Sequence, residues 1–87
     1  MRKNHPNQSI SVELVTANGT AVTSGTTNIY ITKDGGDQAS GAGVVEHEGN
    51  GQWTYHFTQE ETNADSVAIL FENSSAVLVN RQIYTVP

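Results

Sequence analysis

Residues 49–71 have the sequence GNGQWTYHFTQEETNADSVAILF, and this stretch decides the fold. Its Asn50-Gly51 pair tolerates positive φ at both positions, which a two-residue type I′ hairpin turn requires. The aromatic residues Trp53, Tyr55 and Phe57 then alternate with polar residues, as in a strand that is buried on one face. The segment therefore predicts an antiparallel hairpin whose second strand carries an aromatic stripe.

A short connection and a buried strand follow the aromatic strand. Thr58 and Glu61 have the spacing of a capping box, in which each side chain accepts a hydrogen bond from the other residue's backbone N–H. We expect a single helical turn there, ending near Asn63. Residues 67–71 are apolar on both faces, which is typical of a strand at the centre of a sheet.

The rest of the chain repeats short strand patterns between turn residues. Further strands are expected at residues 10–14, 20–23, 27–32, 44–48, 76–79 and 82–86. Asn18-Gly19 is a second type I′ candidate, and residues 37–43 predict a flexible loop of Gly, Ala and Ser. About seven strands without a long helix predict an all-β fold, either a β-sandwich or a small barrel. A small antiparallel β-sandwich of Ig-like type is the preferred architecture. Residues 1–9 predict an extended N-terminal arm outside a single sandwich domain at residues 10–87.

Composition limits what this domain can do alone. A chain of 87 residues buries only a thin core, and without Cys it has no disulfides to supplement that core. Three His and no thiolate leave no ligand set for structural zinc, so we expect no metal and no cofactor. Oligomerisation or docking on a partner is the expected source of extra stability.

Charge is unevenly distributed along the chain. Formal net charge is −5, and from residue 4 onward only Lys33 and Arg81 oppose nine carboxylates. Because such a body repels phosphate, we expect no nucleic-acid partner. The sequence contains no apolar signal region and no run of 18 apolar residues, so neither a signal peptide nor membrane insertion is expected. The absence of Cys fits assembly in a reducing cytoplasm.

Two acidic clusters could bind metal, and simpler interpretations are preferred for both. Asp34 and Asp37 could ligate calcium, but acids among glycines are a common turn composition. Strand alternation places Glu46 and Glu48 on one face and His47 on the other, so these three cannot converge as ligands. A solvated edge face is the preferred interpretation, with a pH-sensitive contact through His47 or His56 left open.

Two further groups are interpreted as structural. Glu60, Glu61 and Asp65 could suggest a glycosidase pair, but they fall at the start of a helical turn, where negative charge is favourable. The aromatic stripe is assigned to the core, and Trp53 is the candidate among the three for partial exposure. No nucleophile lies at motif spacing from a base, so no catalytic residues and no enzymatic activity are expected.

The order of these motifs resembles the small Ig-like β-sandwich modules of tailed-bacteriophage virion proteins. The resemblance covers most of the chain after residue 10 and is carried by residues 19–22, 29–36, 49–51, 58–65 and 83–85. It implies a structural part of a head, tail or fibre with no catalytic residues.

The preferred hypothesis within that family is a capsid decoration (cement) protein of the virion. It would assemble in the host cytoplasm, bind the major capsid protein on the head exterior, and form a homo-oligomer such as a trimer. The arm residues Arg2, Lys3, His5 and Asn7 are the expected partner-binding residues. The alternatives are a tail, baseplate or fibre module, and a carbohydrate- or host-surface-binding module that uses Trp53.

Overall fold

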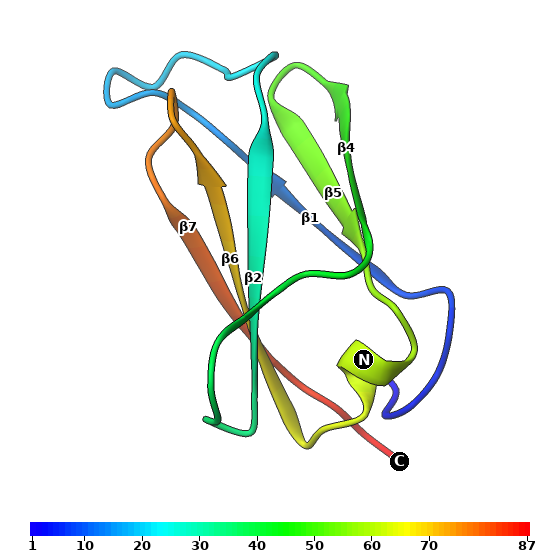
Figure 1. The fold of residues 1–87 in the computed structure, drawn as a ribbon. Helices are drawn as coiled ribbons and strands as arrows, with labels where there is room; N and C mark the ends of the chain where they lie inside the picture. Colours follow the sequence, from blue (N-terminus) through cyan, green and yellow to red (C-terminus); the bar gives the residue numbers. More distant parts are fainter.

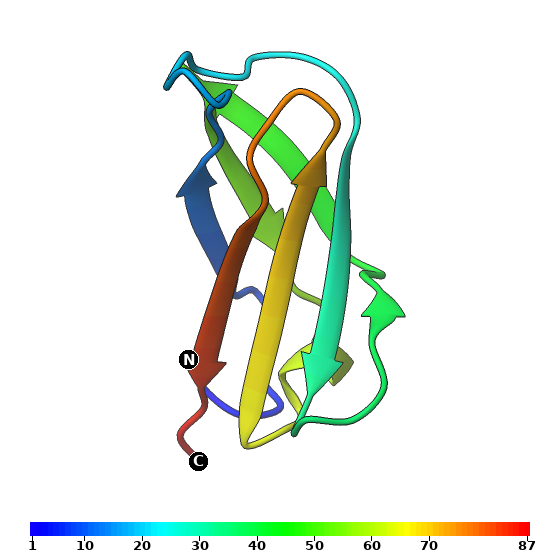
Figure 2. The same cartoon turned by 90° about the vertical axis from the view of Figure 1, so that its left-hand side faces the viewer.

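Two antiparallel sheets pack face to face in the computed structural model, which describes residues Met1 to Pro87 (Figures 1 and 2). The smaller sheet has the order β1-β5-β4, with β1 at Ser9–Glu13, β5 at Gln52–His56 and β4 at Val44–Gly49. The larger sheet has the order β3-β2-β6-β7, with β3 at Ala39–Ser40, β2 at Thr27–Lys33, β6 at Ser66–Asn73 and β7 at Val79–Tyr84. One 3-10 turn, η1 at Glu60–Thr62, connects β5 to β6. A helix that could cross a membrane is not found in the fold.

The strand order confirms the predicted β-sandwich. Hairpins join β4 to β5 and β6 to β7, while the β1–β2, β3–β4 and β5–β6 connections pass from one sheet to the other. In chain order the seven strands occupy the places of B, C, C′, D, E, F and G in an immunoglobulin-like sandwich. The predicted central strand is β6, which lies between β2 and β7.

The core lies between the sheets and contains the aromatic stripe. Trp53, Tyr55 and Phe57 are all buried, as predicted for the core. Trp53, the candidate for partial exposure, is buried as well, since only 5% of its surface is accessible. Its indole Nε1 donates to the carbonyl oxygen of Val22 at 2.8 Å, so burial leaves the polar group satisfied.

The turns agree with the prediction in one hairpin and differ in the other. Asn50 and Gly51 have φ of 53° and 85°, as a type I′ turn requires. At the other candidate, Gly19 has positive φ but Asn18 does not, and Gly19 N–H bonds the carbonyl of Thr16. The predicted strand at 20–23 is reduced to one bridge, because the chain leaves the smaller sheet there to reach the larger one.

Near the C-terminus, one strand replaces the two that were predicted. Residues 73–75 turn as expected, with Ala76 N–H bonding the carbonyl of Asn73. The next residue, Val77, donates its N–H to the carbonyl of Val15, which follows β1 in the chain. Ladder pairing with β6 begins only at Val79.

The capping box is present as predicted. The backbone N–H of Thr58 donates to Glu61 Oε1 at 2.9 Å, and the backbone N–H of Glu61 donates to Thr58 Oγ1 at 3.2 Å. The turn that follows is 3-10 rather than α, and its C-cap is Asn63.

The Glu61 carboxylate is buried and connects three segments of the fold. It accepts hydrogen bonds from Tyr55 Oη at 2.7 Å and from the backbone N–H of Ala42 at 2.9 Å, in addition to that of Thr58. Tyr55 Oη in turn accepts from the N–H of Gly43 at 2.8 Å. Burial, and secondarily the hydrogen bond to Glu61, raise the pKa of Tyr55 well above its ordinary value, which keeps the phenol a donor.

Residues 37–43 were predicted to form a flexible loop, but the hydrogen bonds of Ala42 and Gly43 attach this segment to the domain. The segment contains β3, which pairs with β2, and the N–H of Gly41 donates to the carbonyl of Ile29 at 2.8 Å. Gly43 allows the close approach, because a Cβ there would overlap the carbonyl oxygen of His56.

Replacing Glu61 by Ala should lower the free energy of unfolding by about 3 kcal/mol, because the buried Tyr55 hydroxyl and the part-buried Ala42 N–H lose their acceptor. Urea denaturation followed by Trp53 fluorescence measures this. Glu60→Ala is the matched control, since Glu60 is exposed, and its effect should stay within about 0.5 kcal/mol. Equal effects of the two substitutions would contradict the assigned role of Glu61.

Candidate functional site

The N-terminal residues predicted to bind a partner do not form an extended arm. The backbone N–H of Lys3 donates to Val86 at 2.8 Å, and that of Val86 donates to Met1 at 2.8 Å. Arg2 and Val86 form a parallel bridge, and the Gln8 side chain bonds both backbone groups of Arg2. Partners for the segment's N–H and C=O groups are available within the domain, so the segment folds back on it rather than extending into solvent.

The predicted binding residues belong to a segment at the end of the sandwich that holds both termini and η1 (Figures 1 and 2), and the segment contacts η1 through the Asn4 N–H, which donates to the carbonyl of Thr62. Lys3 Nζ pairs with Asp65 Oδ1 at 2.9 Å, and this hydrogen bond and charge raise the pKa of Lys3. The backbone N–H of His5 donates to Thr62 Oγ1, and Asn7 is exposed with φ of 62°. The guanidinium of Arg2 makes no hydrogen bond or ion pair within the chain, so its charge is free for a partner.

Apolar side chains are exposed at both ends of β7, an edge strand. The four are Val77 and Leu78 before the strand, and Tyr84 and Val86 at its other end. Tyr84 is the most exposed, at 71%. We call these four residues with Arg2 the β7 patch.

The β7 edge is suited to side-chain contact rather than to strand addition. Arg81 stands opposite the buried Ile69 in the β6–β7 ladder, so it lies on the inner-face side of this edge. An inward charge on an edge strand is a device that discourages another strand from pairing there.

The outer faces of the two sheets differ in charge. The larger sheet presents Tyr30, Leu70 and Tyr84 with neutral polar residues, and its one ionisable acid is Glu72, which Asn28 Nδ2 contacts at 3.4 Å. The smaller sheet presents the carboxylates of Glu13, Glu46 and Glu48 with His56, and its strands contain no Lys or Arg. Charge depletion with exposed Tyr is the composition of an interface core, so the larger sheet is the better protein-binding face.

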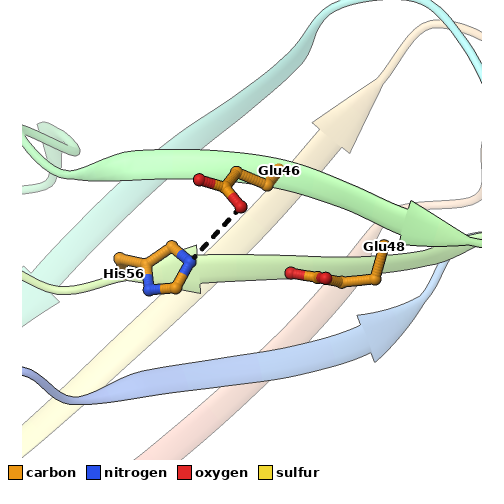
Figure 3. A group of neighbouring side chains, drawn as sticks. All are labelled: Glu46, Glu48 and His56. Carbon is orange, nitrogen blue, oxygen red and sulfur yellow. Dashed lines mark ion pairs between the residues drawn. The ribbon is translucent and has the colours of Figure 1, made fainter.

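The structure separates His47 from its acidic neighbours, as strand alternation predicted. The His47 ring packs against Trp53 at 5.0 Å, and its Nε2 accepts the N–H of Gly51 at 3.1 Å. His56 lies across the hairpin, as expected, and it joins Glu46 and Glu48 on the outer face (Figure 3). Counting back from the Asn50-Gly51 turn without a bulge would pair His56 with Val45. The bulge between His47 and Gly49 shifts the register by one residue, so that His56 pairs with Val44 and lies diagonal to Glu46.

Asp34, Asp65 and Glu61 among the remaining acidic candidates have structural partners. Asp34 and Gly35 have positive φ, and Gly36 N–H bonds Lys33, so residues 33–36 form the predicted turn. Asp34 Oδ1 accepts the backbone N–H groups of Asp65 and Ser66 at 2.9 and 3.0 Å, connecting this turn to the start of β6.

Comparison of the chain with family models, with curated proteins and with solved structures gave no match in any of the three. The class that fold and surface define is a small Ig-like β-sandwich with a neutral outer face, an acidic outer face and an exposed patch along one edge.

Deleting residues 1–8 should lower the midpoint of thermal unfolding by about 10 °C, because the hydrogen bonds from Lys3 and Asn4 to Val86 and Thr62 are lost. Differential scanning calorimetry measures the shift. Arg2→Ala is the control, since it removes a side chain but keeps the backbone bonds. An unchanged midpoint in the deletion variant would mean that the segment adds nothing to the folded domain.

Proposed function

We propose that this chain is a non-enzymatic virion structural protein of a tailed bacteriophage, and specifically a head decoration (cement) protein that binds the capsid exterior. The β7 patch is the observation that carries the proposal. It contains four of the five large hydrophobic side chains that the domain exposes, together with Arg2. The resemblance of its motif order to virion modules supports this class of assembly.

A partner lying along the β7 edge would cover the apolar pairs at both ends of the strand. Tyr and Arg are the residue types that most often dominate interface energetics, and Tyr84 and Arg2 lie near one another through the Arg2–Val86 bridge. Burial of this patch would add apolar area to a core of only 12 buried hydrophobic residues. Docking would therefore stabilise the domain as well as the capsid.

The docking surface in this proposal is a folded patch rather than a free arm. Lys3 is already paired with Asp65, which leaves Arg2 as the available cation of the segment. Binding would require little ordering of the chain, so less conformational entropy is lost than when a disordered arm docks. The carbohydrate-binding alternative relied on an accessible Trp53, and Trp53 is buried.

Sedimentation with phage heads tests the proposal. Heads of the phage that encodes this chain, assembled without it, should bind the purified protein. Tyr84→Ser and Val86→Ser should each weaken binding about tenfold or more, since the truncated side chains lie in the proposed contact. Val44→Ser is the matched control, because Val44 and Val86 are both 56% exposed and Val44 lies on the other sheet.

Detecting the protein in purified heads or in purified tails distinguishes the decoration role from its alternatives. Binding to heads that is lost in the β7-patch variants and retained in Val44→Ser supports the decoration role. Presence in tails alone would replace it with the tail, baseplate or fibre alternative. Absence from both particles would overturn the proposal.

A further inference from the structure

Three potential metal ligands converge on the outer face of the smaller sheet. Glu46 and Glu48 come from β4 and His56 from the end of β5, and their side chains point into the same space (Figure 3). One ligand atom from each lies within 4.8 Å of the other two, and His56 Nε2 is 3.8 Å from Glu46 Oε2. Register brings them together, since His56 pairs with Val44 and therefore shares its face with Glu46.

The three side chains are free to bind a ligand. Neither carboxylate nor the His56 ring makes a hydrogen bond to any other part of the chain, and all three residues are exposed. No Lys or Arg occurs in β1, β4 or β5, so two carboxylates share this position with only an imidazole. A bound cation would relieve the repulsion between the two acids.

We propose that Glu46, Glu48 and His56 form a surface site for a divalent transition-metal ion, with zinc as the best match. Zinc binds imidazole nitrogen and carboxylate oxygen at about 2.0–2.2 Å, which places ligand atoms about 3–3.5 Å apart. The ligand atoms are farther apart than this, with 3.8 Å between His56 and Glu46 and at most 4.8 Å within the group, so the exposed side chains must rotate to close on an ion. Calcium and magnesium fit less well because they prefer all-oxygen ligand sets.

Three protein ligands leave part of the coordination sphere open. In zinc proteins such a vacancy holds water or an incoming ligand. Here the site faces outward from the sheet, so a carboxylate or imidazole of a neighbouring molecule could complete it. The acidic face thus has a binding chemistry of its own, independent of the β7 patch.

Isothermal titration calorimetry with ZnCl₂ on the tag-free chain tests the site. The wild type should bind one equivalent of Zn²⁺, and His56→Ala should weaken binding at least about tenfold. His5→Ala removes an exposed histidine elsewhere and should bind as the wild type does. Glu13→Gln removes a carboxylate from the same outer face without touching the cluster, and should also leave affinity unchanged.

The NMR signals of the histidine rings identify the ligand directly. Those of His56 should shift on zinc addition while those of His5 remain in place. The proposal is overturned if no heat of binding is observed, if Glu13→Gln weakens binding as much as His56→Ala does, or if Ca²⁺ binds as tightly as Zn²⁺ in both wild type and His56→Ala. The last two results would indicate attraction to acidic charge alone.

Discussion

Burial of the Glu61 carboxylate is the constraint on which the meeting of three segments of the sandwich depends. Removing a charge from water is costly, and no cation contacts this one, so hydrogen bonds must offset the cost. The donors come from β5, from the segment that crosses between the sheets and from the turn after β5: Tyr55, Ala42 and Thr58. Because charge-assisted hydrogen bonds are stronger and more directional than neutral ones, the carboxylate fixes how these segments meet. No buried side-chain polar atom is left without a partner in the finished fold.

This arrangement separates the scaffold from the surfaces available for binding. The aromatic strand that first suggests a binding platform contributes Trp53, Tyr55 and Phe57 to the core. What remains outside is divided between two faces, one acidic with His56 and one neutral with Tyr84 near an unpaired Arg2. The proposed assembly role uses the neutral side and the proposed zinc site uses the acidic side, so the two binding chemistries do not compete for one surface.

Local features could be predicted from the sequence, and features set by long-range register could not. The Asn50-Gly51 turn and the Thr58–Glu61 capping box follow from residues a few positions apart, and both are present. Residues 1–8 look unstructured because their partners, Val86 and Thr62, are far along the chain. The same limit applies to Glu61, whose bond to Ala42 joins residues 19 positions apart, and to the meeting of Glu46 with His56. Each of these contacts depends on how the strands pair, and neighbouring residues in the sequence do not specify that pairing.

Native-state hydrogen exchange at Ala42 tests the central role of Glu61 most directly. Ala42 is an exposed residue in a Gly-rich segment, so local composition alone would give fast exchange of its amide. If the Glu61 carboxylate fixes the crossing segment to the core, the Ala42 amide should exchange as slowly as the β5 amides, through global unfolding. Exchange of Ala42 as fast as that of the neighbouring exposed residues Asp37 and Gln38, with β5 still protected, would contradict the account.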